Sequence, residues 1–334
     1  MVRRKELPER AYISGVGSAV PEKVLTNFDL EKIVDTSDEW IRTRSGIERR
    51  HIAEEGESSG TLGARAARKA LEDAHLAPSD VEFIIVATVT PEMFFPSTAC
   101  YIQDIIGANY AGALDVNAAC SGFIYGLALA DLFVSSGKYE HVLLIASETL
   151  SRITDWTDRA TCVLFGDGAG AAVISRSPSP ERGVLGTHLG SDGSKGSLLY
   201  MPGGGSRLPA SYETVKQGMH YIKMNGRELF RVAVQAMGDA TMHLLDALGF
   251  KGEDIDLLIP HQANIRIIQA TARRTGLPME RVFVNLDEYG NTSSASIGIA
   301  LDEAKRSGRV KPGDLVGMVA FGGGLTWASA LLRF

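Results

Sequence analysis

The chain has 334 residues, of which 45% are hydrophobic and 22% are charged, and its formal net charge is −6 at pH 7. This composition is typical of an ordinary globular protein rather than a disordered chain, and the mildly acidic balance argues against general nucleic-acid binding. No run of about 18 uncharged apolar residues occurs, so we predict no membrane-spanning helix.

The N-terminal stretch MVRRKELPER is basic, but no apolar segment follows it, so we do not expect a secretory signal. The three cysteines, Cys100, Cys120 and Cys162, show no C-x-x-C spacing. A disulfide framework or a zinc knuckle is therefore not expected, and a reducing cytoplasm fits best.

Short β-branched runs alternate with longer helical patterns, which predicts an α/β architecture. The predicted strands are VEFIIVATV, YAGALDVN, HVLLIAS, GAGAAVIS, IDLLIP, RVFVNLD and LVGMVAF. The predicted helices are 58–75, 121–137, 225–248, 263–275 and 296–307. Residues 183–217, with GSDGSKG and MPGGGSRLP, show little periodicity and are predicted to be loop.

A weak internal repeat relates the two halves of the chain. Ile255 of IDLLIP aligns with Val81 of VEFIIV, and Ala320 aligns with Ala146, each 174 positions apart. The same offset places Cys120 opposite the turn YGNTSSAS. We therefore predict duplicated halves in which these two turns are equivalent corners. The predicted halves are residues 1–180 and 181–334.

Cys120 lies in DVNAACSGF, which ends a strand-like run and begins a helical one. A thiol in the first turn of a helix is close to the positive end of the helix dipole, which lowers the thiol pKa. Small neighbours also leave room for a substrate carbonyl and for backbone N–H donors. The alternative is a small buried hydrophobe, and this is what we predict for Cys100 and Cys162.

Two further segments place polar groups after strands. His261 and Asn264 follow the strand that ends at Pro260, a position where ligand sites gather in α/β sheets, although a structural loop histidine is the alternative. Asn291 lies in YGNTSSAS, where it either caps a turn or donates a hydrogen bond to a substrate oxygen. Gly322–Gly324 follow another strand and let backbone N–H groups approach a ligand. The histidine spacing gives no support for a metal site.

Six motifs occur in order: DTSDEWIRTRSGI, DVNAACSGF, FGDGAGAAV, PHQANIRII, YGNTSSAS and AFGGGLTWASALLRF. Together they resemble the β-ketoacyl-[acyl-carrier-protein] synthase III family from about residue 11 to Phe334. The resemblance implies the duplicated five-layer α-β-α-β-α thiolase fold and a homodimer. It implies decarboxylative condensation of a short acyl-CoA with malonyl-[acyl-carrier protein], which initiates type II fatty acid biosynthesis. Both compounds are then substrates, and no cofactor is expected.

The resemblance also implies roles for individual residues. Cys120 is the expected nucleophile, with an oxyanion hole made by the backbone N–H groups of Cys120 and Gly323. His261, through Nε2, and Asn291, through its amide, are expected to donate to an enolate oxygen.

The other implied contacts form three groups. The expected CoA-binding residues are Trp40, Arg44, Arg159 and Asn264. The expected acyl-pocket residues are Phe95, Met224 and Phe230, with Phe95 reaching across the homodimer interface. The expected carrier-protein docking residues are Arg266, Arg273 and Arg274, for which a solvated helix face is the alternative.

Two other classes compete with this interpretation. A related secondary-metabolite condensing enzyme or acyltransferase would use the same cysteine, histidine and asparagine, so only its product would distinguish it. A papain-like protease also has these residues in this order, but the local cysteine signature differs.

Overall fold

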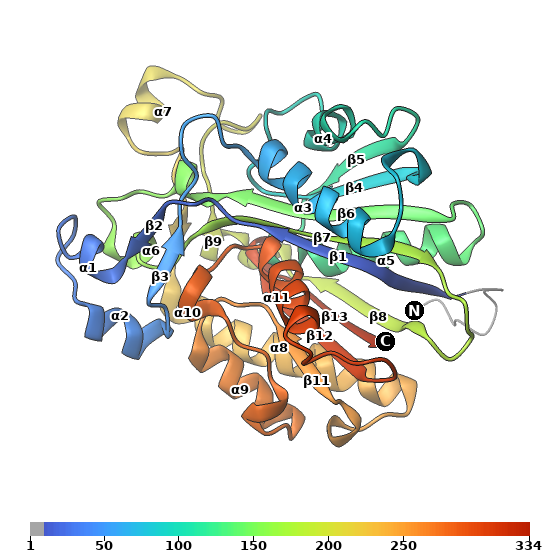
Figure 1. Ribbon diagram of the computed structural model, residues 1–334. Helices are drawn as coiled ribbons and strands as arrows, with labels where there is room; N and C mark the ends of the chain where they lie inside the picture. The colour runs from blue at the N-terminus through green and yellow to red at the C-terminus, as the bar shows by residue number, and fades with distance from the viewer. Residues whose placement is uncertain (1–9) are drawn as a thin grey trace.

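The structure is a computed structural model that describes residues 10–334. The basic stretch at residues 1–9 lies outside the described residues. Two sheets form the framework (Figure 1). The five-stranded sheet has the order β1 (Ala11–Ala19), β7 (Asp167–Arg176), β6 (His141–Thr149), β4 (Phe83–Ala87) and β5 (Gly112–Val116). The four-stranded sheet has the order β11 (Leu257–Pro260), β12 (Leu315–Gly322), β13 (Thr326–Arg333) and β8 (Gly183–Ser191).

Helices cover both faces of each sheet. Between the sheets lie α5 (Gly122–Ser135) and α11 (Ala295–Arg306), whose apolar side chains join residues of both sheets in one core. The outer face of the first sheet is covered by α3 (Ser59–Ala74) and α4 (Thr98–Ile106). The outer face of the second is covered by α8 (Gly226–Leu248) and α9 (Ile265–Thr275). The predicted five-layer thiolase fold is therefore confirmed.

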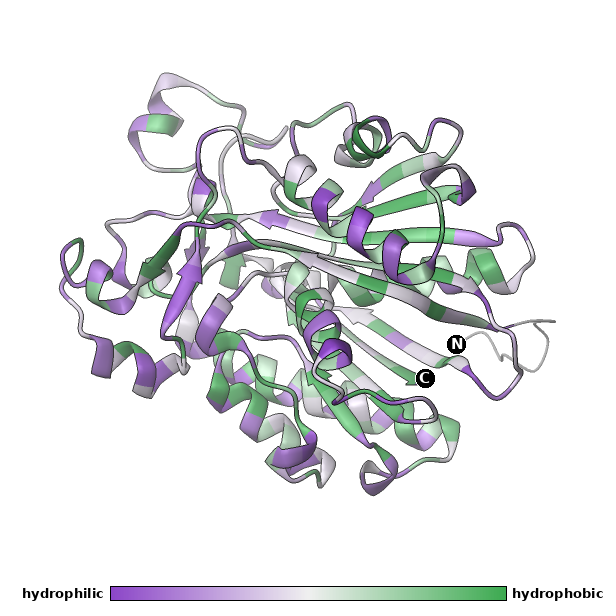
Figure 2. Cartoon of the chain, viewed as in Figure 1, coloured by the Kyte–Doolittle hydropathy of each residue, from purple (hydrophilic) through white to green (hydrophobic). Residues whose placement is uncertain are grey.

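The position of each element follows from its apolar pattern (Figure 2). The β6 strand is buried at every residue after His141, as expected for a strand covered on both faces. The α5 sequence GFIYGLALADLFVS is apolar around most of its circumference, which suits a helix enclosed by two sheets. The α9 helix instead has one apolar face and exposes arginines on the other.

The two halves repeat the same strand plan. The β4–β6 and β11–β12 pairs are parallel, and each continues into antiparallel partners. Ala119 and Ser293, which are 174 positions apart, both have the positive φ that side chains rarely adopt, 47° and 50°. The boundary that we propose at residue 180 falls between β7 and β8.

Two parts of the predicted secondary structure are wrong. Residues 183–191 form the edge strand β8 rather than loop, although GVLGTHLGS lacks a clean apolar alternation. The same predicted loop, 183–217, also contains the short elements β9 (Leu199–Tyr200) and α7 (Tyr212–Lys216). The segment RVFVNLD makes only an isolated bridge, between Val282 and Leu258. There the Gln262 side chain donates to Phe283 O and accepts from Asn285 N, so a side chain satisfies backbone groups that would otherwise extend a strand.

The remaining elements are short and lie mainly around the site described below. They are β2 (Val24–Thr26), α1 (Asn27–Leu30), α2 (Asp38–Ser45), β3 (Arg49–His51), α6 (Arg159–Cys162), β9 (Leu199–Tyr200), α7 (Tyr212–Lys216), β10 (Lys223–Met224) and α10 (Leu286–Tyr289).

The close packing of β7 on α11 depends on glycine. A Cβ atom added at Gly170 would lie 2.5 Å from the Cα atom of Gly298, so we expect Gly170→Ala to lower the free energy of unfolding by about 2 kcal/mol, as overpacked cores do. Urea unfolding would measure the change. Gly193→Ala is the control, because its added methyl meets nothing within 4 Å; equal stability of the two variants would contradict the prediction.

Candidate active site

Cys120 lies in a 3-10 turn, Ala119–Ser121, directly before α5. The turn is tied to the second half of the chain, because Thr326 Oγ1 donates to Ala118 O at 2.8 Å and Ser121 Oγ donates to Thr326 O at 3.2 Å. The positive φ of Ala119 sharpens the turn. Only 6% of Cys120 is exposed, so the thiol sits at a buried junction between the two halves.

The glycine triplet Gly322–Gly324 packs directly against this turn. A Cβ atom at Gly322 would lie 2.5 Å from the backbone nitrogen of Cys120, so a side chain there would push the turns apart. Cys120 and Gly323 line the same cavity. The two backbone segments are thus near enough for their N–H groups to serve one oxyanion.

The pKa of the Cys120 thiol is shifted upward, whereas the sequence predicts a downward shift. Burial is the main cause, and it raises the pKa of Cys120 to about 12; the nearby Glu148 charge also raises it, whereas a hydrogen bond with Ser293 lowers it. The expected lowering by the helix dipole is therefore wrong. Of the other two thiols, Cys162 is buried as predicted, but Cys100 is exposed, so the core prediction for Cys100 is wrong.

His261 follows β11 and is 3% exposed. Its backbone N–H donates to Val319 O at 2.8 Å, and its Nδ1 atom lies 2.7 Å from Ser296 Oγ, at the start of α11. That contact leaves Nε2 as the ring nitrogen for a substrate. Burial lowers the pKa of His261 to about 4, so the imidazole is neutral near neutral pH.

Asn291 is fixed by its backbone. Its N–H donates to Leu164 O at 2.8 Å, and its carbonyl accepts from Gly166 N at 3.0 Å. Its side-chain oxygen accepts from the backbone N–H of Ser293 at 2.9 Å. The amide NH₂ group is consequently the part of the side chain that can donate to a ligand.

A cavity of about 430 Å³ surrounds the thiol. Its lining residues are Val89, Asn117, Ala118, Ala119, Cys120, Leu150, Ile153, Phe165, Leu199, Tyr200, Met201, Ile222, Ser293, Gly323, Gly324 and Thr326. Asn291 adjoins this lining through its bridge to Phe165 and its bond to Ser293. His261 is not a lining residue; its ring contacts Ser296 of α11, which follows the lining residue Ser293 by three positions.

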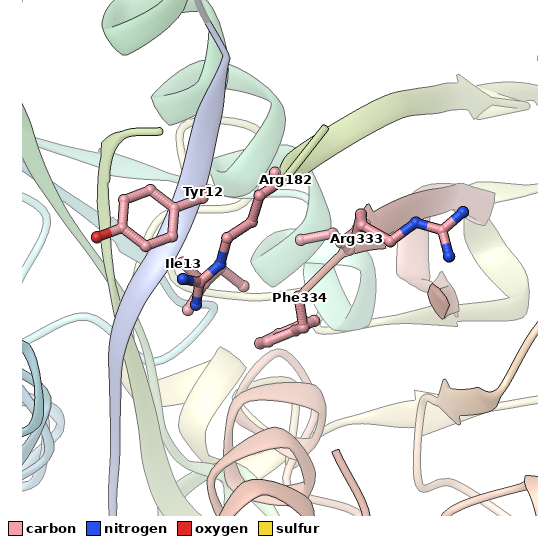
Figure 3. Close-up of a pocket in the computed structure, with 7 residues that line it drawn as sticks. Tyr12, Ile13, Arg182, Arg333 and Phe334 are labelled. Atoms are coloured by element: carbon pink, nitrogen blue, oxygen red, sulfur yellow. The ribbon is translucent and has the colours of Figure 1, made fainter. Parts of the chain in front are cut away.

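A second hollow offers no comparable chemistry (Figure 3). Its walls include Tyr12, Ile13, Arg182, Arg333 and Phe334, and no side-chain thiol, imidazole or carboxylate lines it. Within residues 10–334, no group of three or more histidine, cysteine, aspartate or glutamate side chains is arranged to hold a metal ion.

Three of the expected CoA-binding residues lie together at the surface. The guanidinium carbons of Arg159 and Arg44 lie 4.9 and 5.7 Å from the ring centroid of Trp40. The Asn264 side chain is hydrogen-bonded within the chain: Oδ1 accepts from Arg266 N at 2.9 Å, and Nδ2 donates to Arg44 O at 3.0 Å. This last bond joins the start of α9 to the end of α2, the helix that carries Trp40.

The expected acyl-pocket residues are not in the cavity wall. Phe95 is 83% exposed, Met224 is half-buried in β10, and Phe230 lies under the Arg266 guanidinium, 5.3 Å from its ring centroid. The apolar wall within the chain comes instead from residues that sequence reasoning missed: Leu150, Ile153, Leu199 and Ile222. Leu150 and Ile153 lie in the turn that directly follows β6. Their position just after a predicted strand is the one sequence signal that could have indicated them.

The three arginines of α9 are exposed. Arg274 is paired with Asp239 of α8, and Arg266 covers Phe230. Arg273 lies in the last turn of α9, as Arg274 does. Part of the positive charge predicted for this helix is therefore neutralised within the chain.

The fold and the buried thiol site define the class of protein, and comparison with known proteins agrees. The family model 3-Oxoacyl-[acyl-carrier-protein (ACP)] synthase III matches residues 114–193, and the model of its C terminal matches residues 245–334. The protein is an acyltransferase of the thiolase-fold condensing class. A Beta-ketoacyl-[acyl-carrier-protein] synthase III from Caldanaerobacter subterraneus subsp. tengcongensis is 57% identical over 324 residues, which are 97% of this chain and 98% of the relative. The chain belongs to the β-ketoacyl-[acyl-carrier-protein] synthase III family.

Solved structures show the same likeness. The crystal structure of 3-oxoacyl-[acyl-carrier-protein] synthase III from Aquifex aeolicus is 51% identical, with a TM-score of 0.90 over 97% of this chain and 100% of that one. The priming β-ketosynthase of the R1128 polyketide biosynthetic pathway is 37% identical, with a TM-score of 0.90 over 98% of each chain. None of the helices in residues 10–334 has the length and apolar character needed to span a bilayer.

Proposed function

We propose that this protein condenses a short acyl-CoA with malonyl-[acyl-carrier protein] to give a 3-oxoacyl-[acyl-carrier protein], CO₂ and CoA. This reaction would be the first condensation of type II fatty acid biosynthesis. The observation that supports it best is the junction of the two halves, where a buried thiol and a glycine turn line one cavity and Asn291 is bonded to the lining residue Ser293.

In the first half-reaction, the Cys120 sulfur attacks the acyl-CoA carbonyl and forms a thioester. The carbonyl oxygen becomes an oxyanion, and we assign its stabilisation to the backbone N–H groups of Cys120 and Gly323. Fixed donors in a site that excludes water stabilise such a charge without reorganisation. The close approach of the two turns supports this assignment, because a Cβ atom added at Gly322 would lie only 2.5 Å from the Cys120 nitrogen.

In the second half-reaction, malonyl-[acyl-carrier protein] loses CO₂ and leaves an enolate, which attacks the thioester carbon. We assign the enolate oxygen to His261 Nε2 and the Asn291 amide. The contact between Ser296 and Nδ1 is compatible with a proton on Nε2, and the low pKa of His261 keeps the ring neutral. The Asn291 amide cannot titrate, so it donates at any pH.

We assign the CoA adenine to the Trp40 surface. A purine suits an indole face and guanidinium planes, because all three groups are flat and the guanidinium groups also carry positive charge for phosphate. Arg44 and Arg159 already stack beside this indole. The bond from Asn264 to Arg44 would keep the helix that carries Trp40 in place.

The remaining assignments follow from family membership. We propose that an acidic carrier protein docks on α9 through Arg266, Arg273 and Arg274, and that a homodimer covers the exposed Phe95 so that it reaches the partner's acyl pocket. We propose that this chain's own share of the pocket consists of Leu150, Ile153, Leu199 and Ile222 together with Met224 and Phe230. We also propose that the protein is cytoplasmic and that its reaction needs no cofactor.

The alternative function is condensation or acyl transfer in a secondary-metabolite pathway, which the likeness to the R1128 priming ketosynthase favours. We expect the purified enzyme to convert acetyl-CoA and malonyl-[acyl-carrier protein] into 3-oxobutanoyl-[acyl-carrier protein] with equimolar CO₂, measured by mass spectrometry and radiolabel. An acetylated acceptor formed without CO₂ would instead indicate simple acyl transfer. A panel of acyl-CoAs would identify the primer, since one methylene changes binding by about 1 kcal/mol.

A further inference from the structure

Arg50 is the largest side chain that is completely buried in the described part of the chain. It belongs to β3, at the end of the molecule where α2, α6 and α10 gather (Figure 1), and none of the steps proposed above uses it. Burial lowers the pKa of Arg50 to about 10, so the guanidinium group keeps its charge at neutral pH. A buried charge is costly unless it is paired and hydrogen-bonded. A cation here is therefore expected to have a role that an apolar side chain could not fill.

The guanidinium group joins two parts of the chain that are distant in sequence. Its Nη1 atom donates to Leu25 O at 3.1 Å and to Asn27 Oδ1 at 2.9 Å. Its Nη2 atom donates to Val163 O at 2.8 Å. These three acceptors are uncharged oxygens, and the Nε atom has no hydrogen-bond partner within residues 10–334. The hydrogen bonds thus hold three separate oxygens around one rigid, planar fork of donors.

One branch of this network leads to the proposed adenine surface. Asn27 is also completely buried, and its Nδ2 atom donates to Asp38 Oδ1 at 2.9 Å and to Ile47 O at 2.8 Å. Asp38 is the first residue of α2, the helix that carries Trp40. Through Asn27, the guanidinium group of Arg50 therefore helps to fix the start of this helix.

The other branch leads to Asn291. Val163 ends α6, the short helix that carries Arg159, and the segment after it pairs with the Asn291 backbone. Asn291 N donates to Leu164 O at 2.8 Å, and Asn291 O accepts from Gly166 N at 3.0 Å. The bond from Arg50 to Val163 O therefore anchors the segment on which the Asn291 backbone is held.

The stem of Arg50 also packs against this backbone pairing. A Cβ atom added at Gly166 would lie 3.1 Å from Arg50 Cβ, and one added at Gly290 would lie 3.3 Å from the same atom. Gly166 and Gly290 belong to the two paired segments, one on each side. A shift of Arg50 would consequently be transmitted to the Asn291 turn by direct contact as well as by hydrogen bonds.

We propose that Arg50 is a positioning residue that holds the Trp40 surface and the Asn291 turn in one fixed arrangement. It aligns the site where acyl-CoA binds with the site where the condensation takes place, and it acts through Asn27 and Val163 rather than by touching a substrate. This inference rests on the proposed function, because that function gives Trp40 and Asn291 their roles.

The first test compares two acyl donors for the full-length enzyme. Acetyl-CoA and the acetyl thioester of N-acetylcysteamine deliver the same acyl group to Cys120, but only acetyl-CoA carries an adenine. In Arg50→Met, we expect the half-saturating concentration of acetyl-CoA to rise about 10-fold, which corresponds to about 1.4 kcal/mol of binding. Acylation by the small thioester should keep its wild-type concentration dependence. Rapid quenching and intact-protein mass spectrometry would measure both.

The second test measures the effect on Asn291. Release of radiolabelled CO₂ from malonyl-[acyl-carrier protein] should be about 10²-fold slower in Arg50→Met, the loss that a misplacement of about 1 Å can cause. The same substitution should cause no further loss in an Asn291→Ala background, because Arg50 would act on this step through Asn291. A further 10²-fold loss there would contradict the positioning role.

Two conservative variants separate the branches. Asn27→Asp keeps an oxygen that accepts from Arg50, but it cannot donate to Asp38 or Ile47 O. It should therefore weaken the response to acetyl-CoA and leave CO₂ release at the wild-type rate. Arg50→Lys keeps the charge on a single nitrogen, so both of its effects should lie between those of the wild type and Arg50→Met.

Arg281→Met is the matched control. Arg281 also donates to two backbone carbonyls, Glu253 O and Ile255 O, but it is exposed and these carbonyls belong to neither branch. This variant should keep wild-type values in both tests.

Equal losses with the two thioesters in Arg50→Met would indicate a general loss of structure and would overturn the proposal, as would wild-type values in both tests. Circular dichroism would show whether Arg50→Met folds. If it does not, Asn27→Asp decides, and an unchanged response to acetyl-CoA in that variant overturns the proposal. The proposed function fails differently, through absence of CO₂ release and of a condensed product in the wild-type enzyme.

Discussion

Replacing Cys120 with serine is expected to abolish acyl-enzyme formation. A serine hydroxyl is a much weaker nucleophile than a thiol, because it ionises far less readily. Intact-protein mass spectrometry after incubation with acetyl-CoA should show one acetyl group on the wild-type protein and none on Cys120→Ser.

Cys100→Ser provides the matched control, because Cys100 is the exposed thiol of the chain. This variant should acquire its acetyl group as the wild type does. Equal acetylation of Cys120→Ser and the wild type would remove Cys120 from the mechanism, and with it the reason for assigning Gly323 to an oxyanion hole.

His261→Ala and Asn291→Ala are expected to slow malonyl decarboxylation strongly. Each variant should still acetylate itself, but its rate of malonyl decarboxylation should fall by about 10²-fold or more, the usual loss when one fixed donor to an oxyanion is removed. Release of radiolabelled CO₂ from malonyl-[acyl-carrier protein] would measure the rate. His243→Ala, which alters an exposed histidine of α8, is the control.

The rate of malonyl decarboxylation should also depend on pH in a direction that the His261 pKa defines. Burial lowers the pKa of His261 from 6.5 to about 4. The ring therefore stays neutral well below pH 6.5, and wild-type decarboxylation should show no decline from imidazole protonation until the pH approaches 4. A decline centred near pH 6.5, or CO₂ release that is unchanged in both alanine variants, would contradict the donor role.

Much of the fold could be predicted from the sequence because its helices and central strands are strongly patterned. The predicted helix at 121–137 corresponds to α5, Gly122–Ser135, and the predicted helix at 296–307 corresponds to α11, Ala295–Arg306. The β8 strand was missed because an edge strand that is only partly buried does not need apolar alternation. RVFVNLD has the composition of a strand, but pairing depends on tertiary contacts, and the Gln262 side chain satisfies part of its backbone.

The candidate site was only partly predictable for a related reason. Cys120, His261 and Asn291 each lie in a recognisable local motif, whereas the cavity wall is assembled from segments distant in sequence, including Leu150 and Ile222.

The sign of the Cys120 pKa shift shows how magnitudes decide between opposing effects. A helix dipole contributes at most about 2 kcal/mol in a favourable, partly buried site, which is close to 1.5 pKa units. Complete burial of an ionisable group shifts its pKa by up to about 3 to 5 units in the opposite sense. Sequence indicates that a helix begins near a cysteine, but it does not reveal how completely the thiol is removed from water.

The burial of Cys120 has a consequence for the enzyme at rest. Oxidants and alkylating agents react with the thiolate rather than the protonated thiol, and the raised pKa of Cys120 keeps its sulfur protonated at neutral pH. Between turnovers the sulfur is thereby shielded from peroxide and from adventitious electrophiles. An inhibitor directed at this sulfur would gain more from fitting the cavity that Cys120 lines than from a highly reactive electrophile.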